Sequence, residues 1–166
     1  MSAKSIHVII DTREPTPHPW ERFAPDNITF IRETMETGDF ALGALPDGAV
    51  IERKTSQDLA GCLTSSRERF ERELRRSRHC GAFTVIVEGD LSDVILAARG
   101  VSVNSVVGTL AAWSRRYCPF IFAGSIEQAA NFSFRYLLGQ IREHDKAAVA
   151  IKNMKSSKPD IIPRIA

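Results

Sequence analysis

The run from Gly38 to Asp58 constrains this chain most, because charged residues recur in it between two apolar stretches. The stretches flank a Pro-Asp-Gly segment, a pattern that is typical of a β-hairpin. If the turn is centred on the Pro-Asp bond, Asp39 lies opposite Lys54 on the two strands. Side chains alternate between the faces of a strand, so Glu52 and Lys54 share a face. The sequence therefore predicts one sheet face that carries two carboxylates and an ammonium group.

Such a face has the chemistry of a metal-dependent phosphodiester-cleaving site. Two carboxylates this close repel each other unless a cation lies between them. Mg²⁺ takes oxygen ligands from one or two carboxylates and completes its shell with water and phosphate oxygens. A lysine two residues from a ligand can hold the attacking water or neutralise charge on the phosphate. The alternative is an exposed strand with an acid–lysine pair, which contributes little to stability.

The patterns along the rest of the chain indicate the fold class. Short apolar runs predict strands, and apolar residues three and four apart predict helices. The predicted strands outside the hairpin cover residues 5–10, 27–33, 83–88 and 119–123. The predicted helices begin at Ser56, as an N-cap, and then cover residues 66–80, 92–98, 102–117 and 125–144. Strands that alternate with helices predict an α/β fold, with a central mixed sheet and helices on both faces.

The order of the charged residues resembles a known signature. Gly38-Asp39, then Glu52-Arg53-Lys54 and, after three intervening residues, Asp58, is similar to the nuclease motif of the XPF-type structure-specific DNA endonucleases. Asp11-Thr12-Arg13-Glu14 resembles the upstream acidic motif of that family, and the resemblance extends to about Gly139. It implies a restriction-endonuclease-like fold and a divalent-metal-dependent endonuclease. The implied substrate is branched, forked or flapped DNA.

The acids and the lysine of these motifs receive separate expected roles. Asp39 and Glu52 are expected to ligate Mg²⁺, with Mn²⁺ as a substitute. Asp11 is expected to be a third ligand or a base that acts through water. Lys54 is expected to orient the nucleophilic water or to stabilise the pentavalent phosphate, and Asp58 to support the metal or Lys54. For Asp58 the alternative is a carboxylate that suits the start of a helix.

Three arginines are expected to contact DNA phosphates, because the guanidinium fork matches pairs of phosphate oxygens. They are Arg13, Arg53 and Arg69. The side chain of Arg53 points away from the two catalytic residues beside it, so it could instead pair with a buried acid. Arg69 lies in a helix dense in arginine, whose other arginines are expected on a solvated face.

Two other functions remain open. One is a catalytically silent DNA-binding subunit of a nuclease complex, because the resembled family pairs active with inactive copies. The presence of all the motif acids speaks against it. The other is a metal-dependent phosphohydrolase acting on small nucleotides, which would need a closed pocket with base-stacking groups.

The composition of the chain indicates its domain number, its cellular compartment and the size of any DNA-binding surface. The chain has 166 residues, of which 43% are hydrophobic, as expected for one soluble domain. Three cysteines without metal-ligand spacing favour a reducing cytoplasm, with association with the nucleoid if the source is bacterial. No membrane span is expected. The net charge of only +2 restricts a DNA contact to a local patch. His18 is expected at the surface.

The C-terminal part predicts an interface. The last helix carries two apolar stripes, one more than a single core needs. One stripe holds Phe132, Tyr136 and Gly139, and the other Ala130, Phe134, Leu137 and Ile141. We therefore predict a homodimer through this helix. The expected domains are a nuclease domain, residues 1–145, and a flexible basic tail, residues 146–166. The helix-hairpin-helix modules that the family commonly carries do not fit into the residues after Gly139, so DNA affinity is expected to need the dimer or a partner.

Overall fold

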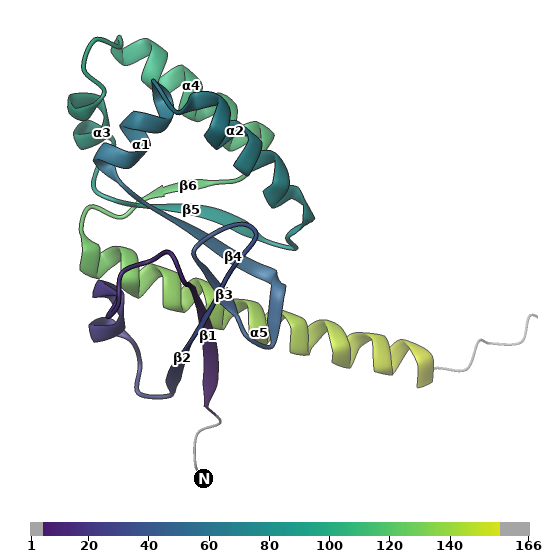
Figure 1. Cartoon of the computed structure of the whole chain (residues 1–166). Coiled ribbons are helices and arrows are strands. Elements are labelled where there is room, and N and C mark those ends of the chain that lie inside the picture. The colour runs from purple at the N-terminus through teal and green to yellow at the C-terminus, as the bar shows by residue number, and fades with distance from the viewer. Residues whose placement is uncertain (1–4, 157–166) are drawn as a thin grey trace, which may run out of the picture.

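A computed structural model describes residues 5–156 of the protein. A mixed sheet forms its centre, with the strands in the order β2-β1-β3-β4-β5-β6 among the described residues (Figure 1). β3 runs antiparallel to both of its neighbours, and the other adjacent pairs are parallel. The strands are β1 (Ile6–Asp11), β2 (Ile28–Glu33), β3 (Phe40–Leu42), β4 (Leu45–Thr55), β5 (Phe83–Glu88) and β6 (Phe120–Phe122).

Helices cover both faces of the sheet, which confirms the predicted α/β class (Figure 1). One face carries α1 (Ser56–Leu63), α2 (Arg67–Arg76), α3 (Leu91–Ala97) and α4 (Val103–Arg116). The other carries α5 (Ile126–Ser156) and the 3₁₀ helix η1 (Pro19–Phe23), while a second 3₁₀ turn, η2 (Ser77–His79), follows α2. Each face has its own hydrophobic core. Successive residues of β4 pack alternately into the two cores: Val50 belongs to one and Ile51 to the other.

The hairpin of β3 and β4 differs in register from the predicted one. Phe40 pairs with Ile51, and the turn is formed by residues 43–44. The Pro-Asp-Gly segment lies inside β4, where the pairing shifts irregularly. Asp39 therefore lies beside Glu52, not opposite Lys54. A shift of two residues keeps every side chain on its face, so the predicted grouping of the three charged residues stands.

Two helix boundaries also differ from the sequence prediction. Thr55, not Ser56, is the N-cap of α1, and its side chain accepts a hydrogen bond from the Asp58 amide. Helix α5 continues to Ser156 instead of ending near His144, so the expected domain boundary at residue 145 falls inside a helix. The flexibility predicted for the tail stays a prediction, since residues 157–166 lie outside the described part. None of the described helices is long and apolar enough to cross a membrane.

Candidate active site

Alternation along β4 brings Glu52 and Lys54 to the face covered by α1 and α2. Glu52 is only 2% exposed, and Lys54 Nζ forms an ion pair with Glu52 Oε1. Lys54 Nζ also lies 5.2 Å from the centre of the Phe70 ring of α2, a cation–π contact. The second carboxylate oxygen of Glu52, Oε2, is buried and has no hydrogen-bond partner among the described residues. A carboxylate oxygen is therefore left without a partner in a place where charge is costly.

Asp39 joins these residues from the position just before β3. Its Oδ2 accepts a 2.7 Å hydrogen bond from the backbone N–H of Arg53, and its own N–H donates to the carbonyl of Ile51 at 2.8 Å. Gly38 makes this approach possible, because its φ is +78° and a Cβ there would lie 2.3 Å from a methyl group of Val50. The glycine before the acid is thus a requirement of the backbone.

The electrostatics of these groups suit a cation with oxygen ligands. Burial raises the pKa of Asp39 from 3.8 to about 6, against the opposing charge of Lys54. Burial also raises the pKa of Glu52 well above its usual range, and the charge of Asp39 adds to that rise. Burial acts to lower the pKa of Lys54. The charges of Glu52 and Asp39 outweigh burial, so the pKa of Lys54 is raised above its usual value. A single ammonium group thus faces two carboxylates that repel each other.

A divalent ion fits this donor set. Asp39 and Glu52 would hold it, and Oε2 of Glu52, which has no partner among the described residues, supplies a free ligand oxygen. No group of three or more His, Cys, Asp or Glu side chains within the described residues is arranged to bind a metal. The two carboxylates alone match the way Mg²⁺ binds, with water and phosphate oxygens filling the other positions.

Asp11, the expected third ligand, is already saturated with donors. It is fully buried, and it accepts hydrogen bonds of 2.7 to 2.8 Å from Arg13 N, Nε and Nη2 and from Met35 N. Burial acts to raise the pKa of Asp11, but these bonds outweigh it and lower the pKa to about 2. Arg13 also donates to the Met35 carbonyl at 2.8 Å. Both residues are therefore committed to bracing the loop before Asp39, and their predicted catalytic and DNA-binding roles stay untested.

Asp58 is not brought into the cluster either. It is exposed in the first turn of α1, where its Oδ2 accepts a 2.7 Å hydrogen bond from Thr55 Oγ1. This is the capping arrangement that the sequence left open as the alternative. Support of the metal or of Lys54 by Asp58 remains a prediction.

Arg53 points to the opposite face of β4 and pairs there with a buried acid. Its Nε and Nη2 each donate to Glu88 at 2.8 Å, and Nη1 lies 3.4 Å from Glu14. Trp20 Nε1 donates to the same Glu88 carboxylate at 2.6 Å. The Arg53 side chain is only 16% exposed. The Arg53 side chain thus anchors β4, and with it the Arg53 amide that donates to Asp39. The DNA contact predicted for Arg53 stays a prediction.

The prediction of a surface position for His18 is wrong. His18 is 1% exposed, because one ring nitrogen accepts from the Trp20 N–H at 3.1 Å and the other lies 2.9 Å from Glu14 Oε2. Its ring also packs edge-on against Phe40 and Trp20. His18 thereby extends the network that holds Glu14 and Arg53 on the sheet face opposite Glu52 and Lys54.

Comparison with known proteins places this site in a family. The ERCC4 domain matches residues 10–136, which include every site residue named above. The chain belongs to the ERCC4 domain family. Its structure is similar to that of XPF from Aeropyrum pernix, with a TM-score of 0.63 and 24% identity over 79% of this chain and 59% of the other. A second structure of that protein, in complex with DNA, matches with a TM-score of 0.61 and 24% identity over 86% and 66% of the two chains.

These matches show that this ERCC4 domain has the XPF-type, restriction-endonuclease-like fold. The chain spans between 59% and 66% of the length of the XPF structures it matches. No curated protein matches it significantly.

Sequence reasoning missed one acid of this ERCC4 domain. Glu73 of α2 lies close enough for its charge to raise the pKa values of Asp39, Glu52 and Lys54. The available signal was its spacing, three residues after Phe70, which faces the same core. Arg69 lies exposed on α2 and lines a surface hollow with Ser65, Ser66 and Arg72, a position that suits its predicted phosphate contact.

Proposed function

We propose that this ERCC4 domain is a divalent-metal-dependent DNA endonuclease that hydrolyses phosphodiester bonds. The observation that carries the proposal is the buried pair Asp39 and Glu52 beside Lys54, with an anionic oxygen of Glu52 left unpartnered. A Mg²⁺ or Mn²⁺ ion held by the two carboxylates would polarise the phosphate and acidify a bound water.

The protein's own residues would position and stabilise the reacting groups. Lys54 is protonated at neutral pH, because the neighbouring carboxylates raise its pKa. It therefore acts as a hydrogen-bond donor to the water or to the charge that develops on the phosphate, and not as the base. The Arg53 N–H fixes Asp39, and Phe70 packs against the ammonium group of Lys54. These contacts hold the donors in place before substrate arrives.

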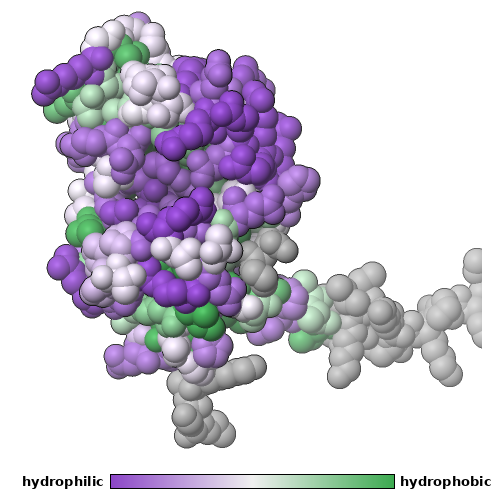
Figure 2. Space-filling model, in the orientation of Figure 1, coloured by the Kyte–Doolittle hydropathy of each residue, from purple (hydrophilic) through white to green (hydrophobic). Residues whose placement is uncertain are grey.

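DNA is the substrate that the surface supports. Figure 2 shows a hydrophilic surface over α2, and Arg69 and Arg72 there make no ion pair with another described residue. The relative from Aeropyrum pernix was crystallised with DNA. Branched, forked or flapped DNA is proposed as the preferred form. The exposed arginines of α2 and the following turn are Arg67, Arg69, Arg72, Arg75, Arg76 and Arg78.

The test is cleavage of end-labelled fork and flap DNA by the wild-type protein and by Glu52→Gln. We expect cleavage with Mg²⁺, none with EDTA, and at least about a hundredfold loss in Glu52→Gln. Gln keeps the shape of the side chain but removes its charge. Binding without cleavage would favour the silent DNA-binding subunit, and cleavage of nucleotides alone would favour the small-molecule phosphohydrolase. Equal cleavage in EDTA would reject the metal.

A homodimer through the C-terminal helix and a cytoplasmic location complete the proposal. Phe132 on α5 is 40% exposed and stacks on Tyr136, with ring centres 6.4 Å apart. Tyr136 is partly buried against the core, so Phe132 is the exposed member of the pair, and an exposed aromatic side chain is typical of protein interfaces. The other stripe packs inside the monomer, since Ala130, Phe134 and Leu137 are buried in the core. The buried thiols of Cys62 and Cys118 fit a reducing compartment.

A further inference from the structure

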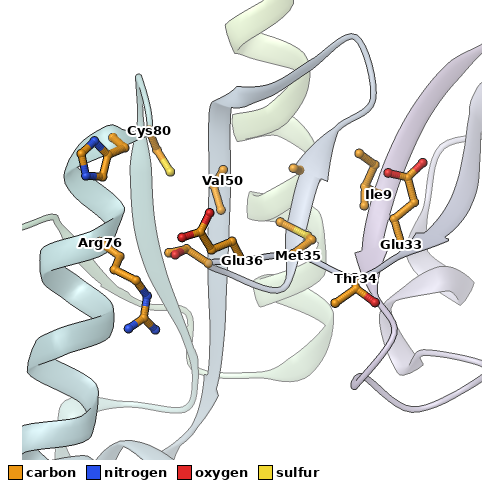
Figure 3. A pocket seen from close by; sticks show the side chains of 11 residues that line it. Ile9, Glu33, Thr34, Met35, Glu36, Val50, Arg76 and Cys80 are labelled. Carbon is orange, nitrogen blue, oxygen red and sulfur yellow. The ribbon is translucent and has the colours of Figure 1, made fainter.

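A cavity of about 280 Å³ lies between the sheet and the end of α2, close to the proposed catalytic face (Figure 3). Its floor is apolar and comes from three neighbouring strands: Ile9, Ala41 and Val50 lie side by side in the sheet. One water molecule takes about 30 Å³, so the cavity has room for a flat ring system. The small side chain of Ala41 in the middle of the floor gives it depth.

The rim of this cavity is polar and charged. Glu33 and Glu36 line it from the end of β2 and the β2–β3 loop, and Arg76 lines it from α2 (Figure 3). His79 of η2 also lines it. All four residues are exposed, and none forms an ion pair with another residue in the described part of the chain. An apolar floor with a few uncommitted polar groups above it is typical of a ligand site.

The position of the floor relative to the catalytic acids indicates which ligand fits. Ala41 follows Asp39 by two residues on β3, and Val50 precedes Glu52 by two residues on β4. Residues two apart in a strand share a face and lie about 7 Å from each other. The cavity is thus one step along the same sheet face from the acids, a distance on the scale of a single nucleotide.

We propose that this cavity receives an unpaired base of the nucleotide next to the phosphate that is cut. The inference rests on the proposed function and names a subsite of it. The carboxylates of Glu33 and Glu36 would repel a phosphate but can accept hydrogen bonds from the amino groups of a base. The Arg76 guanidinium and the His79 ring can stack on a base plane.

Such a subsite would make the enzyme sensitive to DNA structure. A base inside a duplex is stacked and paired, and moving it into a protein pocket costs a few kcal/mol. A base in a flap or beside a junction is already free. The cavity would therefore favour cuts beside single-stranded nucleotides, a preference that needs neither a large basic surface nor contacts to a specific sequence.

The first test uses the wild-type protein with Mg²⁺ and forks in which one nucleotide at a time around the cut is replaced by an abasic residue. We expect one position next to the cut to raise KM about tenfold, as loss of one stacked base does, with kcat changed less than threefold. Equal KM values along the series would overturn the inference while the proposed function stands. Absence of cleavage of the intact fork would overturn both.

A second test assigns the effect to this cavity. Ala41→Leu fills the floor, and Glu36→Ala removes one acceptor from the rim without touching the floor. Both variants should raise KM for the intact fork. The ratio of KM between the sensitive abasic fork and the intact fork should be smaller than in the wild type, because the base and the pocket contribute through the same contact. Glu127→Ala, an exposed acid of α5, should behave as the wild type. If Ala41→Leu does not fold, Glu36→Ala decides. If Glu36→Ala shows the same ratio of KM between the abasic and the intact fork as the wild type, the inference is overturned.

Discussion

Asp39 illustrates how a single buried carboxylate can oppose the stability of its own fold. Burial raises its pKa from 3.8 to about 6, so the native state binds a proton more tightly than the unfolded chain does. The metal-free protein should therefore gain stability as the pH falls from above 6 towards 4, and should carry an unfavourable charge at pH 8. A bound divalent ion would compensate that charge.

Asp39→Asn should consequently raise the stability of the metal-free protein at pH 8. The introduced amide can still accept the hydrogen bond from the Arg53 N–H but carries no charge. We expect a gain on the order of 1 kcal/mol at pH 8 that disappears near pH 4. Urea unfolding in EDTA at both pH values measures it. A variant less stable than the wild type at pH 8 would contradict the electrostatic account of the site.

Asp11 has the opposite character, because its pKa is lowered to about 2 by the donors around it. Its contribution to stability is present above pH 4 and is lost as the pH falls towards 2. Asp11→Asn should lower the free energy of unfolding at pH 7 by about 2 kcal/mol or more. The substitution replaces one of the two acceptor oxygens with an NH2 group, which is a donor and faces the donors of Arg13.

The control for Asp11→Asn is Asp58→Asn, which alters only an exposed helix cap and should cost about 1 kcal/mol or less. At a temperature where Asp11→Asn is folded, its cleavage rate should stay within tenfold of the wild type. Unchanged stability together with loss of cleavage would instead make Asp11 a ligand or a base.

Strand β4 organises the site at the scale of the element. Its alternation sends Glu52 and Lys54 towards α2, and Arg53 towards η1 and Glu88 on the other face. One face of the strand is therefore held by an ion pair, while the other face carries the proposed catalytic residues Glu52 and Lys54. The loop before Asp39 is fixed in the same way by Asp11 and Arg13.

Lys54→Ala tests the face of this element that carries the proposed catalytic residues. The ammonium group lies beside Glu52, where charge develops during phosphate attack, so its loss should lower kcat at least about a hundredfold. DNA affinity should stay within a few-fold, because phosphate contacts elsewhere remain. Lys146→Ala, an exposed lysine on α5, is the matched control. Single-turnover cleavage of bound fork DNA measures the rate, and a wild-type rate in Lys54→Ala would contradict this role.

Local patterns predicted β4 and its charged face, whereas specific side-chain contacts, both local and long-range, decided the rest. The grouping of Glu52 with Lys54 depends only on strand alternation, and it survives the error in hairpin register. The saturation of Asp11 depends on three donor groups of Arg13, two residues away, and on the amide of Met35, which is far away in the sequence. The burial of His18 depends on Glu14 and Phe40 packing around it. Such contacts leave no periodic signal in a single sequence.

At the scale of the whole molecule, α5 joins the core and the proposed interface. Its residues Phe134 and Leu137 are buried beneath the sheet, whereas Phe132 is 40% exposed on another side of the helix. One apolar stripe therefore packs inside the monomer, and in the other Tyr136 packs partly against the core while Phe132 is exposed and available to a second copy of the chain.

Phe132→Glu should convert the proposed dimer into a folded monomer, because it places a charge in the interface alone. Phe134→Glu should instead unfold the protein, since it buries an unpaired charge in the core. Light scattering at micromolar concentration and thermal melting separate the two effects. A wild-type protein with the mass of one chain would reject the dimer.

The most direct test of the metal site is to locate the ion. Crystals of the wild-type protein soaked in Mn²⁺ should show an anomalous scattering peak at about 2.0 to 2.2 Å from oxygens of Asp39 and Glu52, as expected for a small hard cation. The peak should be absent from Asp39→Asn crystals treated in the same way. Mn²⁺ bound elsewhere, with none between Asp39 and Glu52, would contradict the account of this site.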